Sequence, residues 1–163
     1  MTMSAVAVVR VRGHAKIHRN AVETMEMLRL RRPNHCVLLP LNTTTKGMLQ
    51  AVKDYVTWGE VNHDTIVELL KSRGEIAGGE RLTDKYVKAN SEFASISALA
   101  KAIEKAEAKM VDVKGLKPVM RLHPPVRGYK KVKRPYSVGG AVGYRGAEIE
   151  RLLLRMLHDK EAK

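Results

Sequence analysis

The chain has 163 residues, of which 44% are hydrophobic, which is enough to bury one sizeable core. It contains no run of about eighteen uncharged apolar residues and only one cysteine, Cys36. The composition therefore excludes a membrane-spanning helix and an internal disulfide, and is typical of a reducing, cytoplasmic setting. The formal net charge of +13 makes a polyanion the first partner to consider.

Residues 1–60 alternate between strand and helix patterns. Small apolar residues and valines at 5–11 predict a strand rather than a signal peptide, because Arg10 interrupts the apolar run and no cleavage site follows. Four further elements are expected: a helix capped by Asn20 that ends before Pro33, a strand at 35–39, a helix starting at Thr44 or Thr45, and a strand at 55–58. This order predicts a compact unit of the α/β (α+β) class.

Residues 61–163 are predicted to form a helical extension that makes one structural unit with the 1–60 core. The expected elements are a helix capped by Asn62 and closed by Gly74, a helix at about 95–110, a strand at 119–122 and a helix at 147–158. The last helix carries an apolar stripe that must dock on the body of the protein. A basic loop at 113–147 is therefore expected to be tethered at both ends.

The positive charge is segregated along the chain. Residues 1–40 carry +5, residues 41–112 carry −1 and residues 113–163 carry +9, and no carboxylate occurs between Asp112 and Glu148. A solvated cationic face would account for some of this charge, and a membrane-surface role would require bulky aromatics on a basic helix, which are lacking. Such segregation favours a surface that binds nucleic acid.

The segment 123–140, HPPVRGYKKVKRPYSVGG, concentrates this charge in a loop. It holds three prolines, three glycines and five Lys or Arg residues, and its prolines and glycines disfavour regular structure. Tyr129 and Tyr136 are interleaved with the cations. Each could stack on an unpaired base or anchor the loop by packing, and the sequence leaves both open.

Chemistry-bearing motifs are not evident in the sequence. His14 and His18 lack a nearby acid or thiol, and His35 and Cys36 are adjacent strand residues that point to opposite faces, so no metal is expected. Glycines 139–146 follow a loop rather than a strand, which disfavours a dinucleotide site. No nucleophile with an adjacent base is recognisable. The sequence therefore predicts neither an enzyme nor a cofactor.

The residues expected to contact RNA lie in the turn after the first strand, in the connection before the second strand, at the second helix and in the basic loop. They are Arg12, Lys16, His18, Arg19, Arg29, Arg31, Arg32, Asn34, His35, Lys46, His123, Arg127, Tyr129, Lys130, Lys131, Lys133, Arg134 and Arg145. Lys46 is among them because the first turn of a helix offers free backbone N–H groups to phosphate.

Four stretches of the sequence resemble the large-subunit ribosomal protein thirty family in its longer archaeal and eukaryotic form. They are LRLRRPNHCVLLPLNTTTKGMLQAVKDYVTWGE, ELLKSRGEI, RLTDKYV and RLHPPVRGYKKVKRPYSVGGAVGYRGAEIERLLLRM, which together span most of the chain. One departure is local. Where the family often has Pro-Arg-Gly-Gly after the proline pair, this chain has Val126-Arg127-Gly128-Tyr129 after Pro125.

The resemblance implies a β-α-β-α-β core similar to the ferredoxin-like fold, with a three-stranded sheet, the first strand central and two helices on one face. It also implies a structural role in the cytoplasmic ribosome. The implied partners are large-subunit ribosomal RNA, near the 5S RNA region, and neighbouring ribosomal proteins. A free-standing regulatory RNA-binding protein and a basic protein–protein adaptor remain the alternatives.

Overall fold

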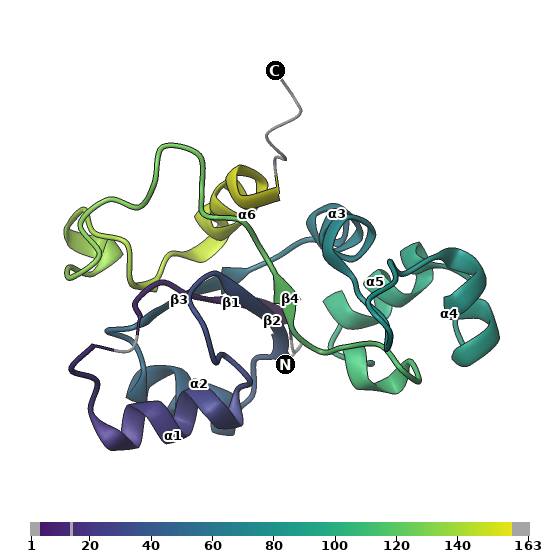
Figure 1. Ribbon diagram of the computed structural model, residues 1–163, viewed down its shortest axis with the longest axis horizontal. Coiled ribbons are helices and arrows are strands. Elements are labelled where there is room, and N and C mark those ends of the chain that lie inside the picture. Colours follow the sequence, from purple (N-terminus) through teal and green to yellow (C-terminus); the bar gives the residue numbers. More distant parts are fainter. Residues whose placement is uncertain (1–3, 14, 158–163) are drawn as a thin grey trace.

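A mixed sheet with the first strand at its centre organises the molecule (Figure 1). The computed structural model describes residues 4–13 and 15–157. β1 (Ala5–Arg10) pairs antiparallel with β2 (His35–Pro40) and β3 (Val56–Glu60). β4 (Met120–Arg121) extends the sheet beside β2, and β5 (Gly143–Tyr144) lies parallel to β3. The expected α/β class and the central first strand are confirmed, but the sheet has five strands rather than three.

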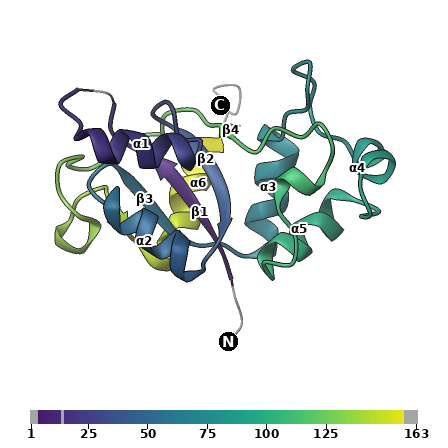
Figure 2. The same ribbon diagram turned by 90° about the horizontal axis from the view of Figure 1, so that it is seen from below.

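Both faces of the sheet are covered. All six residues of β1 are buried, as is typical of a strand with protein on either side. Val6 and Val8 pack with α1 (Arg19–Met27) and α2 (Thr43–Ala51), whereas Ala5, Ala7 and Val9 face the other layer. Figures 1 and 2 show α1 and α2 side by side on the first face.

The second face of the sheet shares one apolar cluster with the C-terminal half of the chain. This cluster includes residues of α3 (His63–Arg73), α5 (Ile96–Glu104) and α6 (Ile149–Leu157), together with Val87 of α4 (Asp84–Asn90). Burying a large aliphatic side chain stabilises the fold by about 1.5–3 kcal/mol, so this shared cluster ties the extension to the sheet.

Most helix boundaries follow from capping. Asn62 caps α3 by accepting from the Thr65 amide at 3.0 Å, and Gly74 closes that helix, both as expected. The cap predicted at Asn20 is wrong, because the His18 ring nitrogen Nδ1 accepts from the Asn20 amide instead. α2 begins at Thr43, one or two residues earlier than expected, because Asn42 is its cap.

Of the last two predicted helices, α5 is shorter than expected and α6 starts two residues later than expected. α5 ends at Glu104 rather than near Met110, and the chain then turns through Ala106 with a φ of 59°. A 3₁₀ turn at Gly146–Glu148 precedes α6. The predicted end of this helix at His158 lies outside the described residues.

Cys36 is fully buried in β2, where it packs as a small apolar side chain. Burial raises the pKa of its thiol to about 12, so the thiol stays protonated at neutral pH. A protonated, enclosed thiol is a poor nucleophile, and the residue acts as part of the core.

Candidate nucleic-acid interface

Arg10 joins two of the basic connections. Its side chain is buried, and the guanidinium donates from Nη1 to the carbonyl of Leu30 at 2.8 Å and from Nε to that of Arg12 at 2.9 Å. The amide of Asn34 in turn donates to the Arg10 carbonyl at 2.7 Å. Burial lowers the pKa of Arg10, although such a group stays charged at neutral pH. Arg10 therefore holds the loop after β1 against the loop before β2.

The loop after β1 exposes most of its predicted cations. Lys16 and Arg19 are exposed, and Arg19 pairs with Glu23 one helical turn later at 3.0 Å. Arg12 is half-buried, with its guanidinium 5.3 Å from the centre of the Tyr55 ring. His18 is exposed at the start of α1, where it caps the helix.

The loop before β2 gathers more positive charge. Arg29, Arg31 and Arg32 are exposed, and Arg29 has a φ of 66°, an αL conformation that is uncommon for a residue with a side chain. His35 is half-buried, and its pKa is lowered by desolvation and then by the neighbouring charges of Arg121, Arg32 and Arg10. The imidazole is therefore neutral at neutral pH.

A hollow of about 520 Å³ opens beside this loop. It is lined by Arg29 and Arg31 from the loop, by His35 at the start of β2, by Lys117 and Arg121 from the segment around β4, and by the carboxylate of Glu26 from α1. Lys117 and Arg121 are not among the residues that the sequence predicts to contact RNA. Their place follows from the pairing of β4 with β2, which sets Arg121 opposite His35.

The basic segment 123–140, which we call the arm, is anchored at its base. Pro125 is buried, and the Tyr129 hydroxyl donates to Oδ1 of Asn34 at 2.7 Å. Burial raises the pKa of Tyr129. Of the two roles left open for this ring, the packing one is favoured. The anchor also places the base of the arm against the loop before β2.

Beyond Tyr129 the charged side chains of the arm are exposed to solvent. Figure 1 shows the segment leaving β4, extending away from the sheet and returning towards α6. At its far end the Gly140 amide donates to the Pro135 carbonyl at 2.8 Å and closes a turn. The exposed cations of the arm are Arg127, Lys130, Lys131, Lys133 and Arg134. The arm is therefore a hydrogen-bonded loop that displays its charged side chains to solvent.

The three remaining residues predicted to contact RNA are Lys46, His123 and Arg145. Lys46 is exposed, but its amide donates to the Asn42 carbonyl at 2.9 Å, so the free N–H group expected there is already used. His123 is exposed at the start of the arm. Arg145 is half-buried, and its guanidinium lies 4.8 Å from the centre of the Tyr136 ring.

The described residues hold neither a metal-binding cluster nor a membrane-spanning helix. Within residues 4–13 and 15–157, no three His, Cys, Asp or Glu side chains are grouped so that they could hold a metal ion. His14, one of the two histidines spaced four apart, lies outside the described residues. In the same part of the chain no helix combines the length and apolar character needed to cross a bilayer.

Known proteins share both the core and the extension of this chain. Residues 6–56, which span β1 to the start of β3, match the family model described as Ribosomal protein L30p/L7e. Proteins named Large ribosomal subunit protein uL30 are similar over nearly their whole length. The one from Methanosphaera stadtmanae is 46% identical over 93% of this chain and 99% of its own.

Two further proteins of that name show similar identity and coverage. The protein from Methanopyrus kandleri is 48% identical over 90% of this chain and 100% of its own, and the one from Archaeoglobus fulgidus is 47% identical over 92% and 98%. Because these matches cover 90% or more of the chain, they include α3–α5 and the arm, which the family model does not reach. With that coverage and identity, the chain belongs to the uL30 family of large ribosomal subunit proteins.

Proposed function

We propose that this protein is a structural component of the large subunit of the cytoplasmic ribosome and binds large-subunit ribosomal RNA through its basic loops. The observation that carries the proposal is the joining of three basic segments. Arg10 connects the loop after β1 to the loop before β2, and Tyr129 connects the arm to Asn34 in that second loop. Cations that are far apart in the sequence thus form one region.

The proposed mode of binding is neutralisation of RNA phosphates by lysine and arginine. Each neutralised phosphate releases condensed counterions, which supplies most of the affinity and makes it depend on salt. The loops are kept in place before binding by hydrogen bonds from the Arg10 guanidinium to the carbonyls of Arg12 and Leu30 and from the Asn34 amide to the Arg10 carbonyl. Less conformational entropy is then lost on association. Residues 61–112 of the extension carry eight Lys or Arg and nine Asp or Glu residues, so we assign this part to packing and to contacts with neighbouring ribosomal proteins.

The family relationship supports a site near the 5S RNA region as part of the same proposal. No catalytic step is included, because the assignment rests on a charged surface and on relatives that are named as ribosomal components. A regulatory RNA-binding protein that acts away from the ribosome would use the same cations. Assembly into the subunit, rather than RNA affinity alone, separates that alternative from this proposal.

The salt dependence of RNA binding tests the electrostatic mode. With six to eight phosphates neutralised on a partly single-stranded ribosomal RNA fragment, the slope of log affinity against log salt is expected to be about −5. Filter binding of the full chain at several salt concentrations gives this slope. An affinity that does not change with salt would contradict the proposal and favour a basic adaptor for proteins.

A further inference from the structure

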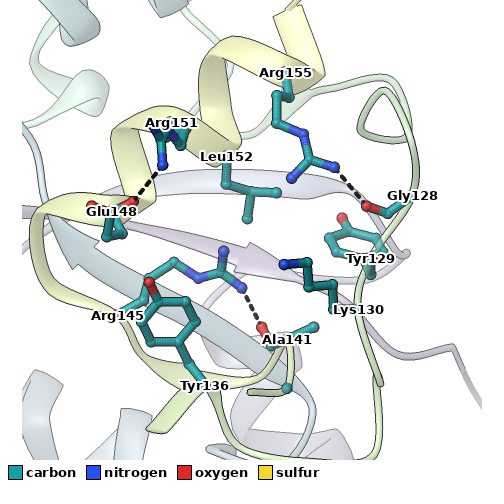
Figure 3. A pocket seen from close by; sticks show the side chains of 11 residues that line it. Gly128, Tyr129, Lys130, Tyr136, Ala141, Arg145, Glu148, Arg151, Leu152 and Arg155 are labelled. Atoms are coloured by element: carbon teal, nitrogen blue, oxygen red, sulfur yellow. Dashed lines mark hydrogen bonds and ion pairs between the residues drawn. The ribbon is translucent and has the colours of Figure 1, made fainter. Parts of the chain in front are cut away.

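The base of the arm and α6 enclose a small cationic pocket (Figure 3). Its volume is about 220 Å³, and its charged lining consists of Lys130, Arg145, Arg151 and Arg155 with the single carboxylate Glu148. Leu152 contributes an apolar wall. Pockets that enclose drug-sized ligands are about 300–1,000 Å³, so this one suits part of a nucleotide rather than a whole cofactor.

Arg155 is fixed in place by the arm. From α6 its Nε and Nη2 donate to the carbonyl of Val126 at 3.0 and 2.6 Å, and Nη2 also donates to that of Gly128 at 2.8 Å. These bonds use one edge of the guanidinium. Within the part of the chain that the structure describes, no hydrogen bond uses Nη1 of Arg155, so this group can bind a ligand.

Arg145 approaches the same space from the other side. Its Nε donates to Oγ1 of Thr57 at 2.8 Å and its Nη2 to the carbonyl of Ala141 at 2.6 Å, while Tyr136 covers one face of the guanidinium. Here too Nη1 has no hydrogen-bond acceptor among the described residues. Burial lowers the pKa of Arg145; Tyr136, Tyr129 and Glu148 oppose this shift, and the charge of Arg155 adds to it.

A purely structural role for these arginines does not explain why a third cation lines the pocket, or why its lining carboxylate pairs with a different arginine. Lys130 also directs its amino group into the space between the two guanidinium groups, as Figure 3 shows, which adds a third positive charge. The one acid, Glu148, lies 3.7 Å from exposed Arg151 and so is already paired. Gathering like charges in a partly buried site costs free energy unless an anion joins them.

We propose that this pocket binds one phosphate group of the RNA, held by Nη1 of Arg145, Nη1 of Arg155 and the amino group of Lys130. Guanidinium groups held by backbone carbonyls present N–H donors in a fixed geometry, which suits phosphate oxygens. Donors that converge from three elements fit a tetrahedral anion. The inference rests on the proposed RNA binding and adds a defined place for one phosphate.

The decisive comparison is between Lys130→Gln and Lys133→Gln. Both residues are exposed, both lie in the arm and both changes remove one charge, but only Lys130 lines the pocket. Losing a charge-assisted hydrogen bond is expected to weaken binding of a ribosomal RNA fragment about tenfold for Lys130→Gln. For Lys133→Gln the expected loss is about two- to threefold, as for one screened contact. Equal losses of RNA affinity in the two variants would overturn the proposal that this pocket binds a phosphate.

A second measurement follows the Nε–H signals of Arg145 and Arg155 by nitrogen-15 NMR. RNA is expected to shift both signals in the wild type and to shift them less in Lys130→Gln. Inorganic phosphate, titrated separately, is expected to shift the same signals at higher concentration. Shifts with phosphate but not with RNA would overturn the assignment to an RNA phosphate. If the wild type binds RNA with a steep salt dependence while both signals stay unmoved, the pocket fails but the proposed function survives.

Discussion

Gly59→Ala is expected to destabilise the protein by about 3 kcal/mol or more, which for a chain of this size lowers the Tm by roughly 10 °C. Gly59 is buried in β3, and a Cβ there would overlap the carbonyl oxygen of Gly146 and lie 2.9 Å from Cγ2 of Ile149. The cause is steric, since the substituted position meets the backbone that leads into α6. The Arg145 amide donates to the Trp58 carbonyl at 3.0 Å, which keeps the two segments from separating freely.

Gly47→Ala is the matched control. Gly47 lies within α2, and a Cβ there meets no atom within 4 Å. Alanine is the better helix former by up to about 1 kcal/mol, so this variant is expected to be slightly more stable than the wild type. Urea unfolding of the two variants in parallel gives both free energies. If Gly59→Ala proves as harmless as Gly47→Ala, the segment before α6 does not dock on β3 as described.

A fourfold arm variant, in which glutamine replaces each of Lys130, Lys131, Lys133 and Arg134, is expected to bind RNA much more weakly while keeping its fold. All four side chains are exposed, and exposed charges contribute little to folding stability, so the Tm should hardly change. On a partly single-stranded RNA, four lost phosphate contacts make the salt slope shallower by up to about 3. At 0.1 M salt the affinity then falls by up to several hundredfold. Salt-dependent affinity and melting temperature are measured on the same preparation.

A second quadruple variant removes the same charge from the extension. Lys71, Lys85, Lys88 and Lys101 are exposed on α3, α4 and α5, and glutamine at these positions is expected to leave the salt slope nearly unchanged. Equal weakening by both variants would mean that affinity follows net charge alone. An arm variant that unfolds early would mean that the four cations stabilise the fold.

Hydrophobic periodicity was sufficient to predict the β-α-β-α-β order and α3, because each of those elements carries its own apolar pattern. β5 could not be predicted in this way. It has only two residues, and its place beside β3 depends on a contact made across 86 positions, the bond from Thr57 Oγ1 to the Gly143 carbonyl at 2.9 Å. The cap of α1 differs from the prediction for a local reason, since asparagine is among the commonest cap residues and histidine is not.

The charged residues likewise fall into two groups: those whose setting could be predicted from the sequence and those whose setting depends on distant contacts. The exposure of Lys131, Lys133 and Arg134 follows from their loop sequence, because it has no apolar pattern that could bury them. Burial of Arg10 does not, because one of the carbonyls that accept from it, that of Leu30, belongs to a turn 20 residues away. An arginine inside an apolar strand was the available signal. Arg155 was missed because its sequence context is that of an ordinary helix face, and only the returning arm supplies its partners.

The central claim, that the protein is held in the large ribosomal subunit through RNA contacts, is tested most directly by reconstitution. Large subunits depleted of their own uL30 are mixed with the full chain, washed at increasing salt and separated on a sucrose gradient. We expect the wild type to stay with the large subunit at a salt concentration that releases the arm variant, while the extension variant stays bound like the wild type. A folded wild-type protein that remains at the top of the gradient even at low salt would contradict the claim.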